Sequence, residues 1–252
     1  SDAFQRFETL EFCARTQIYG SQIGKPRFLT EAMIAEHNTH MRLEFPEMKE
    51  VSHPSLEREK RLEICQIVKR ACQHGLMKSS YGTVSARWQG NDFLITPNGV
   101  PRWDLKAEDI VQIKDGKREP GKHPSLTAFL HQQIYALHPE VNSIILTQSP
   151  YLMAFAVTGV EINVRTIPES WIFLKDMPQL KFGAQDNGSN EVAKCISREK
   201  PAVLIQNECV VVVGDKLLQT FDYLEVAEFS AKSIVMASSL GQMVPINDEQ
   251  TE

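Results

Sequence analysis

The sequence predicts an α/β domain whose central sheet is mixed and largely antiparallel. Apolar residues recur at helical spacing near both ends of the chain, and the middle holds short runs rich in β-branched residues. These runs alternate with further helical segments, which is typical of layered α/β domains. Several of them are joined by turns of only two or three residues, such as Gln89-Gly90-Asn91, and such short turns favour antiparallel pairing.

The individual elements follow from apolar spacing and from the residues that end each segment. Gly24 and Pro26 end the first helix, and Pro150 suits the first turn of a later one. A long helical stripe of apolar residues ends near Gly75, after which the pattern changes to strands. Helices are predicted over 3–22, 31–43, 56–76, 125–139, 150–157, 190–197 and 217–239, and strands over 81–88, 92–97, 110–113, 142–147, 202–206 and 209–214.

The composition is that of a soluble globular protein. Of 252 residues, 42% are hydrophobic and 23% are charged, and no apolar run approaches the roughly 18 residues of a membrane helix. The net charge is −5 and the basic residues are scattered, which gives no electrostatic support for nucleic-acid binding. Five cysteines without a CxxC pair indicate reduced thiols. We therefore expect a cytoplasmic protein with no nucleic-acid or membrane partner.

The first predicted helix repeats the last one at a constant offset of 217 residues. Identical pairs include Phe4/Phe221, Glu8/Glu225, Glu11/Glu228, Phe12/Phe229, Ala14/Ala231, Ser21/Ser238 and Gly24/Gly241. Two amphipathic helices can look alike by chance. The alternative is that residues 1–30 are the tail of a preceding, similar domain in a tandem repeat.

That alternative sets the domain boundaries that we expect. Residues 1–50 form an N-terminal helical extension, made of the tail of a preceding copy and a linker, and residues 51–252 form the main domain. The chain begins at Ser1-Asp2 without methionine, and we expect it to be a piece of a longer protein.

Several blocks of the main domain carry a resemblance to a known family. The blocks are "GTVSAR", "FLITPNGVP", "EDIV", "HPSLTAFLHQQIY", "HPEVNSIILTQSPYLMAFAV" and "AVLIQNECVVVVGD". In order and spacing, from about residue 60 to 241, they resemble the class II aldolase/adducin family. The resemblance implies a three-layer α/β/α domain, usually in a tetramer with sites between subunits. It also implies a divalent metal, typically zinc, in the members that are sugar-phosphate aldolases and epimerases.

The positions that carry metal chemistry in that family hold other residues in this chain. Thr147-Gln148-Ser149 stands where the resemblance places a His-x-His pair, Glu208 matches the third histidine, and Thr127 matches the catalytic glutamate. Hydroxyl and amide groups are weak ligands for zinc. A threonine hydroxyl also cannot replace a carboxylate as a base at neutral pH. These four replacements predict that the family's metal chemistry is lost.

The positions that hold a substrate phosphate in the family are better kept. Gly82, Thr83, Asn98, Gly99 and Ser125 stand at these places. A phosphate cradle of small residues and backbone amides is one interpretation. The other, which we favour, is that Gly82 and Gly99 are turn residues and that Ser125 is a helix N-cap.

Three further features, a histidine pair, a single histidine and a cysteine, each have a chemical and a structural interpretation. The pair His37-x-x-His40 could bind a metal, but two histidines without a third ligand are more often solvated. His131 is expected to be packed rather than catalytic. Cys209 is expected to be a small buried residue rather than a reactive thiol.

Two hypotheses follow for function. The preferred one is a non-catalytic, metal-free module, a pseudoenzyme that assembles with itself or with a homologous aldolase-like copy as a homo-oligomer or tandem protein. The alternative is a lyase or isomerase acting on a small phosphorylated sugar, with altered or partner-supplied metal ligands. The first needs no cofactor, and the second needs zinc or another divalent metal.

Overall fold

The computed structural model describes residues 2–39, 44–175, 177–186, 190–247 and 249. Within them one sheet of eight strands runs in the order β4-β3-β2-β1-β5-β8-β7-β6. The strands are β1 (Thr83–Gln89), β2 (Asp92–Ile95), β3 (Val111–Lys114), β4 (Lys117–Arg118), β5 (Ser143–Thr147), β6 (Gln179–Leu180), β7 (Ala202–Ile205) and β8 (Cys209–Gly214). The helices are α1 (Asp2–Ile23), α2 (Glu31–Thr39), α3 (Ser55–Gln73), α4 (Ala128–Leu137), α5 (Pro150–Thr158), α6 (Pro168–Leu174), α7 (Glu191–Cys195) and α8 (Leu217–Ala237). Two short 3₁₀ turns cover Arg102–Asp104 and Ala107–Asp109.

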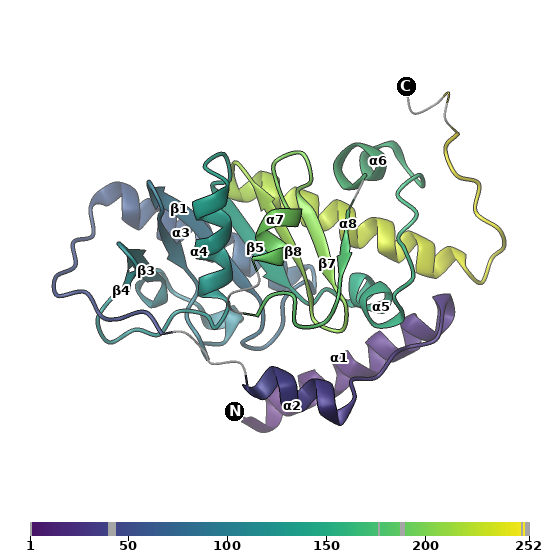
Figure 1. Cartoon of the computed structure of the whole chain (residues 1–252), viewed down its shortest axis with the longest axis horizontal. Coiled ribbons are helices and arrows are strands. Elements are labelled where there is room, and N and C mark those ends of the chain that lie inside the picture. The colour runs from purple at the N-terminus through teal and green to yellow at the C-terminus, as the bar shows by residue number, and fades with distance from the viewer. Residues whose placement is uncertain (1, 40–43, 176, 187–189, 248, 250–252) are drawn as a thin grey trace.

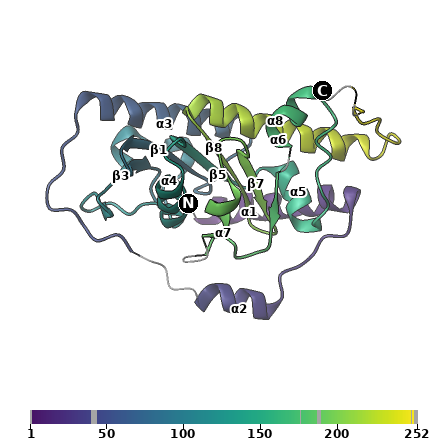
Figure 2. The same cartoon turned by 45° about the horizontal axis from the view of Figure 1, so that its top comes forward.

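The sheet is mixed and largely antiparallel, as predicted. Only the pair β6–β7 is parallel, and every other neighbouring pair in this sheet is antiparallel. One apolar core joins the sheet to α3, α5 and α8, and a second core joins the other face to α4 and α7. Figure 2 shows α3 and α8 running across one side of the sheet. The expected three-layer α/β/α arrangement is therefore confirmed.

The central strands are apolar along their whole length because both faces of the sheet are covered. In β8, Val210 and Val212 point into the core with α3, α5 and α8, whereas Val211 and Val213 point into the core with α4 and α7. Residues that alternate between two buried faces leave no polar position in the run. This explains the sequence "CVVVVG", which has no polar side chain between the turn and Asp215.

The element boundaries differ from the sequence prediction in a few places. The helix expected from residue 125 begins at Ala128, and residues 125–127 belong to the turn before it. The helix expected over 31–43 is present over Glu31–Thr39, and residues 40–43 lie outside the described residues. The strands β4 and β6 were not predicted, since two-residue strands carry no apolar pattern of their own. The seven-residue helix α6 was not predicted either. No helix among the described residues is long and apolar enough to cross a bilayer.

The helix α1 packs against α5, and α1 and α2 both lie below the sheet in the view of Figure 1. Tyr19 of α1 stacks on Tyr151 of α5 with ring centroids 4.3 Å apart. Beyond the helix, the backbone N–H of Arg27 donates to the carbonyl of Val157 at 2.7 Å. The N-terminal segment is thus packed on the main domain.

A buried carboxylate joins α8 to the start of α5. Glu228 accepts the backbone N–H groups of Tyr151 and Leu152, each at 2.9 Å, and the fully buried Ser149 lies beside it. Burial raises the pKa of the Glu228 carboxyl, and the two amide groups act in the opposite direction. These N–H groups belong to the first turn of α5 and have no partner within the helix. Glu228 therefore supplies the cap that the turn before α5 does not.

A second buried polar group lies between the sheet and α4. The side chain of His131 is fully buried, and its Nδ1 is 2.7 Å from the hydroxyl of Ser85. The same hydroxyl is 2.7 Å from the phenol oxygen of Tyr135. Burial lowers the pKa of His131 to about 3, so the ring is neutral in the folded protein. The packed histidine that the sequence suggested is present, and it is enclosed in the core.

Glu228→Ala is expected to lower the free energy of unfolding by about 2–4 kcal/mol, because it leaves two buried N–H groups of α5 without an acceptor. Urea unfolding measures this change. Glu225→Ala on the same helix is the control. It removes only partly exposed pairs with Arg70 and His74 and is expected to cost less than about 1 kcal/mol. Equal losses in the two variants would contradict the cap.

The neutral His131 should also make stability depend on pH. Its folded pKa lies below the unfolded value of about 6.5, so its contribution is complete above that pH and is lost as the pH falls toward 3. Between about pH 7 and about pH 5 the wild type should lose about 2 kcal/mol more than His131→Gln. Urea unfolding at the two pH values checks this, with His123→Gln as the exposed control. A pH dependence that His131→Gln leaves unchanged would be inconsistent with this role.

Candidate functional site

The turn between β5 and α5 places its three polar side chains inside the fold. The hydroxyl of Thr147 donates to the carbonyl of Leu76, and Gln148 Nε2 donates to the carbonyl of Glu208 at 2.9 Å. Ser149 is fully buried beside the Glu228 carboxylate. Thr147 therefore ties the turn to Leu76 after α3, and Gln148 ties it to the β7–β8 connection.

Three of the other predicted site residues form a cluster of hydroxyl groups. Thr83 Oγ1 is 2.6 Å from Ser125 Oγ, and Thr127 Oγ1 is 3.2 Å from each of these oxygens. Thr83 and Ser125 are buried and Thr127 is half-buried. Residues far apart in sequence thus come together, and their hydroxyls bond to one another.

At the other positions predicted to hold a phosphate, backbone N–H groups also already form hydrogen bonds within the protein. The N–H of Asn98 donates to the carbonyl of His123 at 2.9 Å, and the N–H of Ser125 donates to the carbonyl of Thr96 at 3.0 Å. Gly82 has φ +91°, and a Cβ there would lie 2.9 Å from the Met77 side chain, so this position needs glycine. Ser125 lies three positions before Ala128, the first residue of α4. Thr127, not Ser125, therefore holds the N-cap position that the sequence suggested for Ser125.

A zinc ion does not fit the positions that the family uses. Thr147 and Ser149 offer hydroxyls that are buried, and the first already donates to a carbonyl. Neutral oxygens of this kind bind zinc far more weakly than imidazole or thiolate. Thr127 offers no carboxylate for proton transfer.

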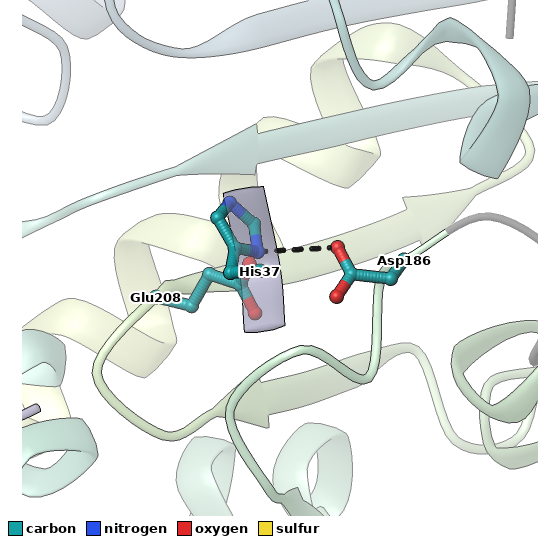
Figure 3. A group of neighbouring side chains, drawn as sticks. All are labelled: His37, Asp186 and Glu208. Carbon is teal, nitrogen blue, oxygen red and sulfur yellow. Dashed lines mark ion pairs between the residues drawn. The ribbon is translucent and has the colours of Figure 1, made fainter. Parts of the chain in front are cut away.

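Glu208 lies in a different group of metal-binding side chains. His37 of α2, Asp186 and Glu208 offer donor atoms that all lie within 4.8 Å of one another (Figure 3). His37 Nδ1 is 3.3 Å from Asp186 Oδ1. Among the described residues this is the one such group of three or more histidine, cysteine, aspartate or glutamate side chains. It combines the nitrogen and oxygen ligands that zinc accepts in proteins.

The surroundings hold Glu208 in a fixed orientation. Its carboxylate accepts the backbone N–H of Gly183 at 3.2 Å and a hydrogen bond from the Gln185 amide. Burial raises the pKa of the Glu208 carboxyl above its ordinary value, and these two donors oppose the shift. The next residue, Cys209, carries a buried thiol. Burial raises the pKa of this thiol well above its ordinary value, so it is not a reactive thiolate.

A cavity of about 580 Å³ opens beside this group. Its wall includes His37 and Asp186 together with two basic side chains, Arg27 and Lys181, and the carboxylate of Glu36. The volume lies in the range of small-molecule sites. The cavity therefore presents two cationic groups and two of the three potential metal ligands, and the Glu208 carboxylate lies within 4.8 Å of those two ligands.

A second cavity of about 520 Å³ lies between α1 and the β5–α5 turn. It is lined mainly by apolar side chains, among them Phe12, Met77 and Met153, and it reaches Thr147 and Gln148. The N-terminal extension thus lies over the β5–α5 turn.

The sequence predicted two members of this group as candidate site residues and did not predict the third. Glu208 was identified by its family position and His37 as one of two histidines on a helix, but neither was connected to the other. His40 lies outside the described residues. Asp186 was missed, since a single aspartate in a loop carries no pattern that distinguishes it from a solvated residue.

Comparison with known proteins agrees with this arrangement of the fold. Residues 62–235 match the family described as "Class II Aldolase and Adducin N-terminal domain". An L-fuculose phosphate aldolase of Methanococcus vannielii is 35% identical over 158 residues, which cover 61% of this chain and 83% of the relative. A 5-methylthioribulose-1-phosphate/5-deoxyribulose-1-phosphate aldolase of Escherichia coli is 28% identical over 202 residues, covering 75% of this chain and 91% of the relative.

Solved structures show the same fold. The YgbL protein of Escherichia coli superposes with a TM-score of 0.70 at 20% identity, over 79% of this chain and 100% of that protein. An L-fuculose 1-phosphate aldolase from Glaciozyma antarctica gives a TM-score of 0.66 at 21% identity, over 81% and 84%. With the family matched over more than half of its length, this chain belongs to the class II aldolase and adducin family.

Proposed function

We propose that this chain is a lyase or isomerase domain for a small phosphorylated sugar, with a metal site that differs from the one usual in its family. One observation carries the proposal. Glu208, matched by the resemblance to the family's third ligand, forms one group of potential metal ligands with His37 and Asp186. His37 and Asp186 in turn line a cavity that also presents Arg27 and Lys181.

The residues of this cavity have the chemistry that such a reaction needs. One nitrogen and two carboxylate oxygens form a three-ligand set that leaves a position open for substrate. A bound zinc ion there would polarise a substrate carbonyl. Arg27 and Lys181 suit a phosphate group, and the carboxylate of Glu36 on the same wall can accept a proton.

The substrate class is supported by the relatives. The proteins that match this chain with 25–35% identity are named as aldolases of fuculose phosphate, methylthioribulose 1-phosphate and deoxyribulose 1-phosphate. Each name denotes a ketose monophosphate of five or six backbone carbons. A cavity of about 580 Å³ is large enough for a molecule of that size.

A second candidate function is a non-catalytic module that acts in assembly. It is favoured by the hydrogen bonds that occupy Thr147, Thr83, Ser125 and Thr127 and by the apolar cavity under α1. In this function the chain binds no metal and contributes surfaces to an oligomer or to a tandem protein. Metal content separates the two candidates before any activity is measured.

After purification in the presence of zinc and removal of the excess, the protein is expected to retain about one zinc ion per chain. Inductively coupled plasma mass spectrometry gives the stoichiometry, and calorimetric titration gives the affinity. His37→Ala should weaken binding more than about 100-fold, since loss of an outer-shell partner alone costs 10–100-fold. His123→Ala, an exposed histidine outside the group, is the control. Absence of zinc from the wild type would leave the non-catalytic module as the function.

Retro-aldol cleavage is tested with L-fuculose 1-phosphate and 5-deoxyribulose 1-phosphate, with release of dihydroxyacetone phosphate as the readout. Glu36→Gln should lower kcat by about 10²–10⁴-fold while the zinc content stays at the wild-type value, because Glu36 is proposed as a base and not as a ligand. Glu31→Gln, on the same helix, is the matched control. A zinc-loaded wild type that cleaves neither substrate and gains no stability from either would contradict the lyase proposal.

A further inference from the structure

The outward face of α1 has the sequence of a buried face. Phe4, Phe7, Leu10 and Ile18 are 59–68% exposed, an unusual density of large apolar side chains for one side of a surface helix. At the offset of 217 residues they correspond to Phe221, Leu224, Ala227 and Val235 of α8. Those four residues are at most 1% exposed and pack against the sheet. α1 therefore has the pattern of a core helix but presents it to the outside.

The inward face of α1 shows the reverse relation. Phe12, Tyr19 and Ile23 pack against the core that includes α5. Their counterparts are Phe229 and Met236 of α8 and Leu240 in the turn just after it, which are 56%, 56% and 86% exposed. The apolar residues of α1 thus match those of α8 on both faces, but the face that is buried in one helix is exposed in the other. A chance resemblance is not expected to give this relation. The agreement indicates that α1 occupies, on this domain, a position that an α8-type helix takes on a neighbouring domain.

The contact between α1 and α5 shows what such a docking requires. Tyr19 stacks on Tyr151, and Gly20 brings the two helices close enough that a Cβ there would lie 3.2 Å from Val157 Cγ2. Gly24 lies equally close to Val160, at 3.0 Å. The matching positions in α8 and just after it are Met236, Ala237 and Gly241. They are again one large and two small residues, so the same close approach is sterically possible.

We propose that the outer stripe of α8, made of Phe229, Ser233, Met236 and Leu240, is a docking surface for the α5 face of a second class II aldolase domain. The geometry is that of α1 on α5 in this chain. Within this chain α1 already covers α5, so the partner must be a domain whose α5 face is open. Docking of one face on a different face of the next domain is a heterologous contact, which propagates head to tail and closes only as a ring.

The test uses a second copy of this same domain with its α5 face uncovered. Deleting residues 1–30 removes α1 and exposes that face. The shortened chain retains the buried residues of both cores, which begin at Phe45 in one core and at Ile64 in the other. In addition, the YgbL structure is matched over its whole length by 79% of this chain, which supports independent folding of the main domain. Circular dichroism and a melting curve check that it folds.

Sedimentation velocity over a range of concentrations is the readout. The shortened chain is expected to form species larger than the full chain forms under the same conditions. Phe229→Glu in the shortened chain should abolish this added association. Ile172→Glu, at an equally exposed apolar residue of α6, should leave it unchanged. Adding a peptide of residues 1–30 should reverse the association, because the peptide competes for α5.

A full-length variant covers the case in which the shortened chain does not fold. Tyr19→Asp combined with Ile23→Asp removes the contacts of α1 with α5 while the chain stays intact, and it should show the same association. A folded shortened chain or double variant that sediments as the wild type does would overturn the proposal. So would equal effects of Phe229→Glu and Ile172→Glu. Neither result depends on zinc or on catalysis, so the metal-site proposal stands or falls separately.

Discussion

The hydrogen bonds from the amides of Tyr151 and Leu152 to the Glu228 carboxylate determine how β5, α5 and α8 meet. α5 begins directly at the end of a central strand, and its first N–H groups would otherwise be buried without acceptors. A carboxylate near a helix N-terminus also interacts favourably with the helix dipole. Because the turn 147–149 lies between β5 and this cap, its side chains are held inside the fold. In this chain the strand-turn-helix unit is organised by a structural acid.

The position of α5 in turn determines what the N-terminal extension can do. α1 crosses α5, and the chain then passes Val157 and Asn207 before α2 begins. Asn207, which directly precedes Glu208 in sequence, donates a hydrogen bond from its Nδ2 to the carbonyl of Arg27 at 2.8 Å. This path delivers His37 to the β7–β8 connection. The packing of the N-terminal segment on α5 therefore forms both the apolar cavity under α1 and the polar cavity beside Glu208.

The sheet and the long helices could be predicted from sequence because each is buried on one or two faces and carries the matching period. β7 and β8 were recognisable as apolar runs, and α8 as a helical stripe. β4 and β6 were not, because two residues paired through backbone groups leave no side-chain period. The site was predicted in part. Family position identified Glu208 and Thr147, but the approach of His37 and Asp186 to Glu208 depends on how a loop and α2 pack, which no local pattern encodes.

The location of His37 on α2 has a consequence for the dynamics of the extension. α2 is joined to the domain by the segments before and after it and has few buried residues of its own. An ion held jointly by His37, Asp186 and Glu208 would act as a clasp between this helix and the sheet. Binding free energy would then appear as protection of α2 amides against hydrogen exchange, with little change in the melting of the core. Ion binding at this site and the ordering of the N-terminal extension would then be coupled in one equilibrium. A change in cellular metal concentration would therefore affect the N-terminal segment before the core.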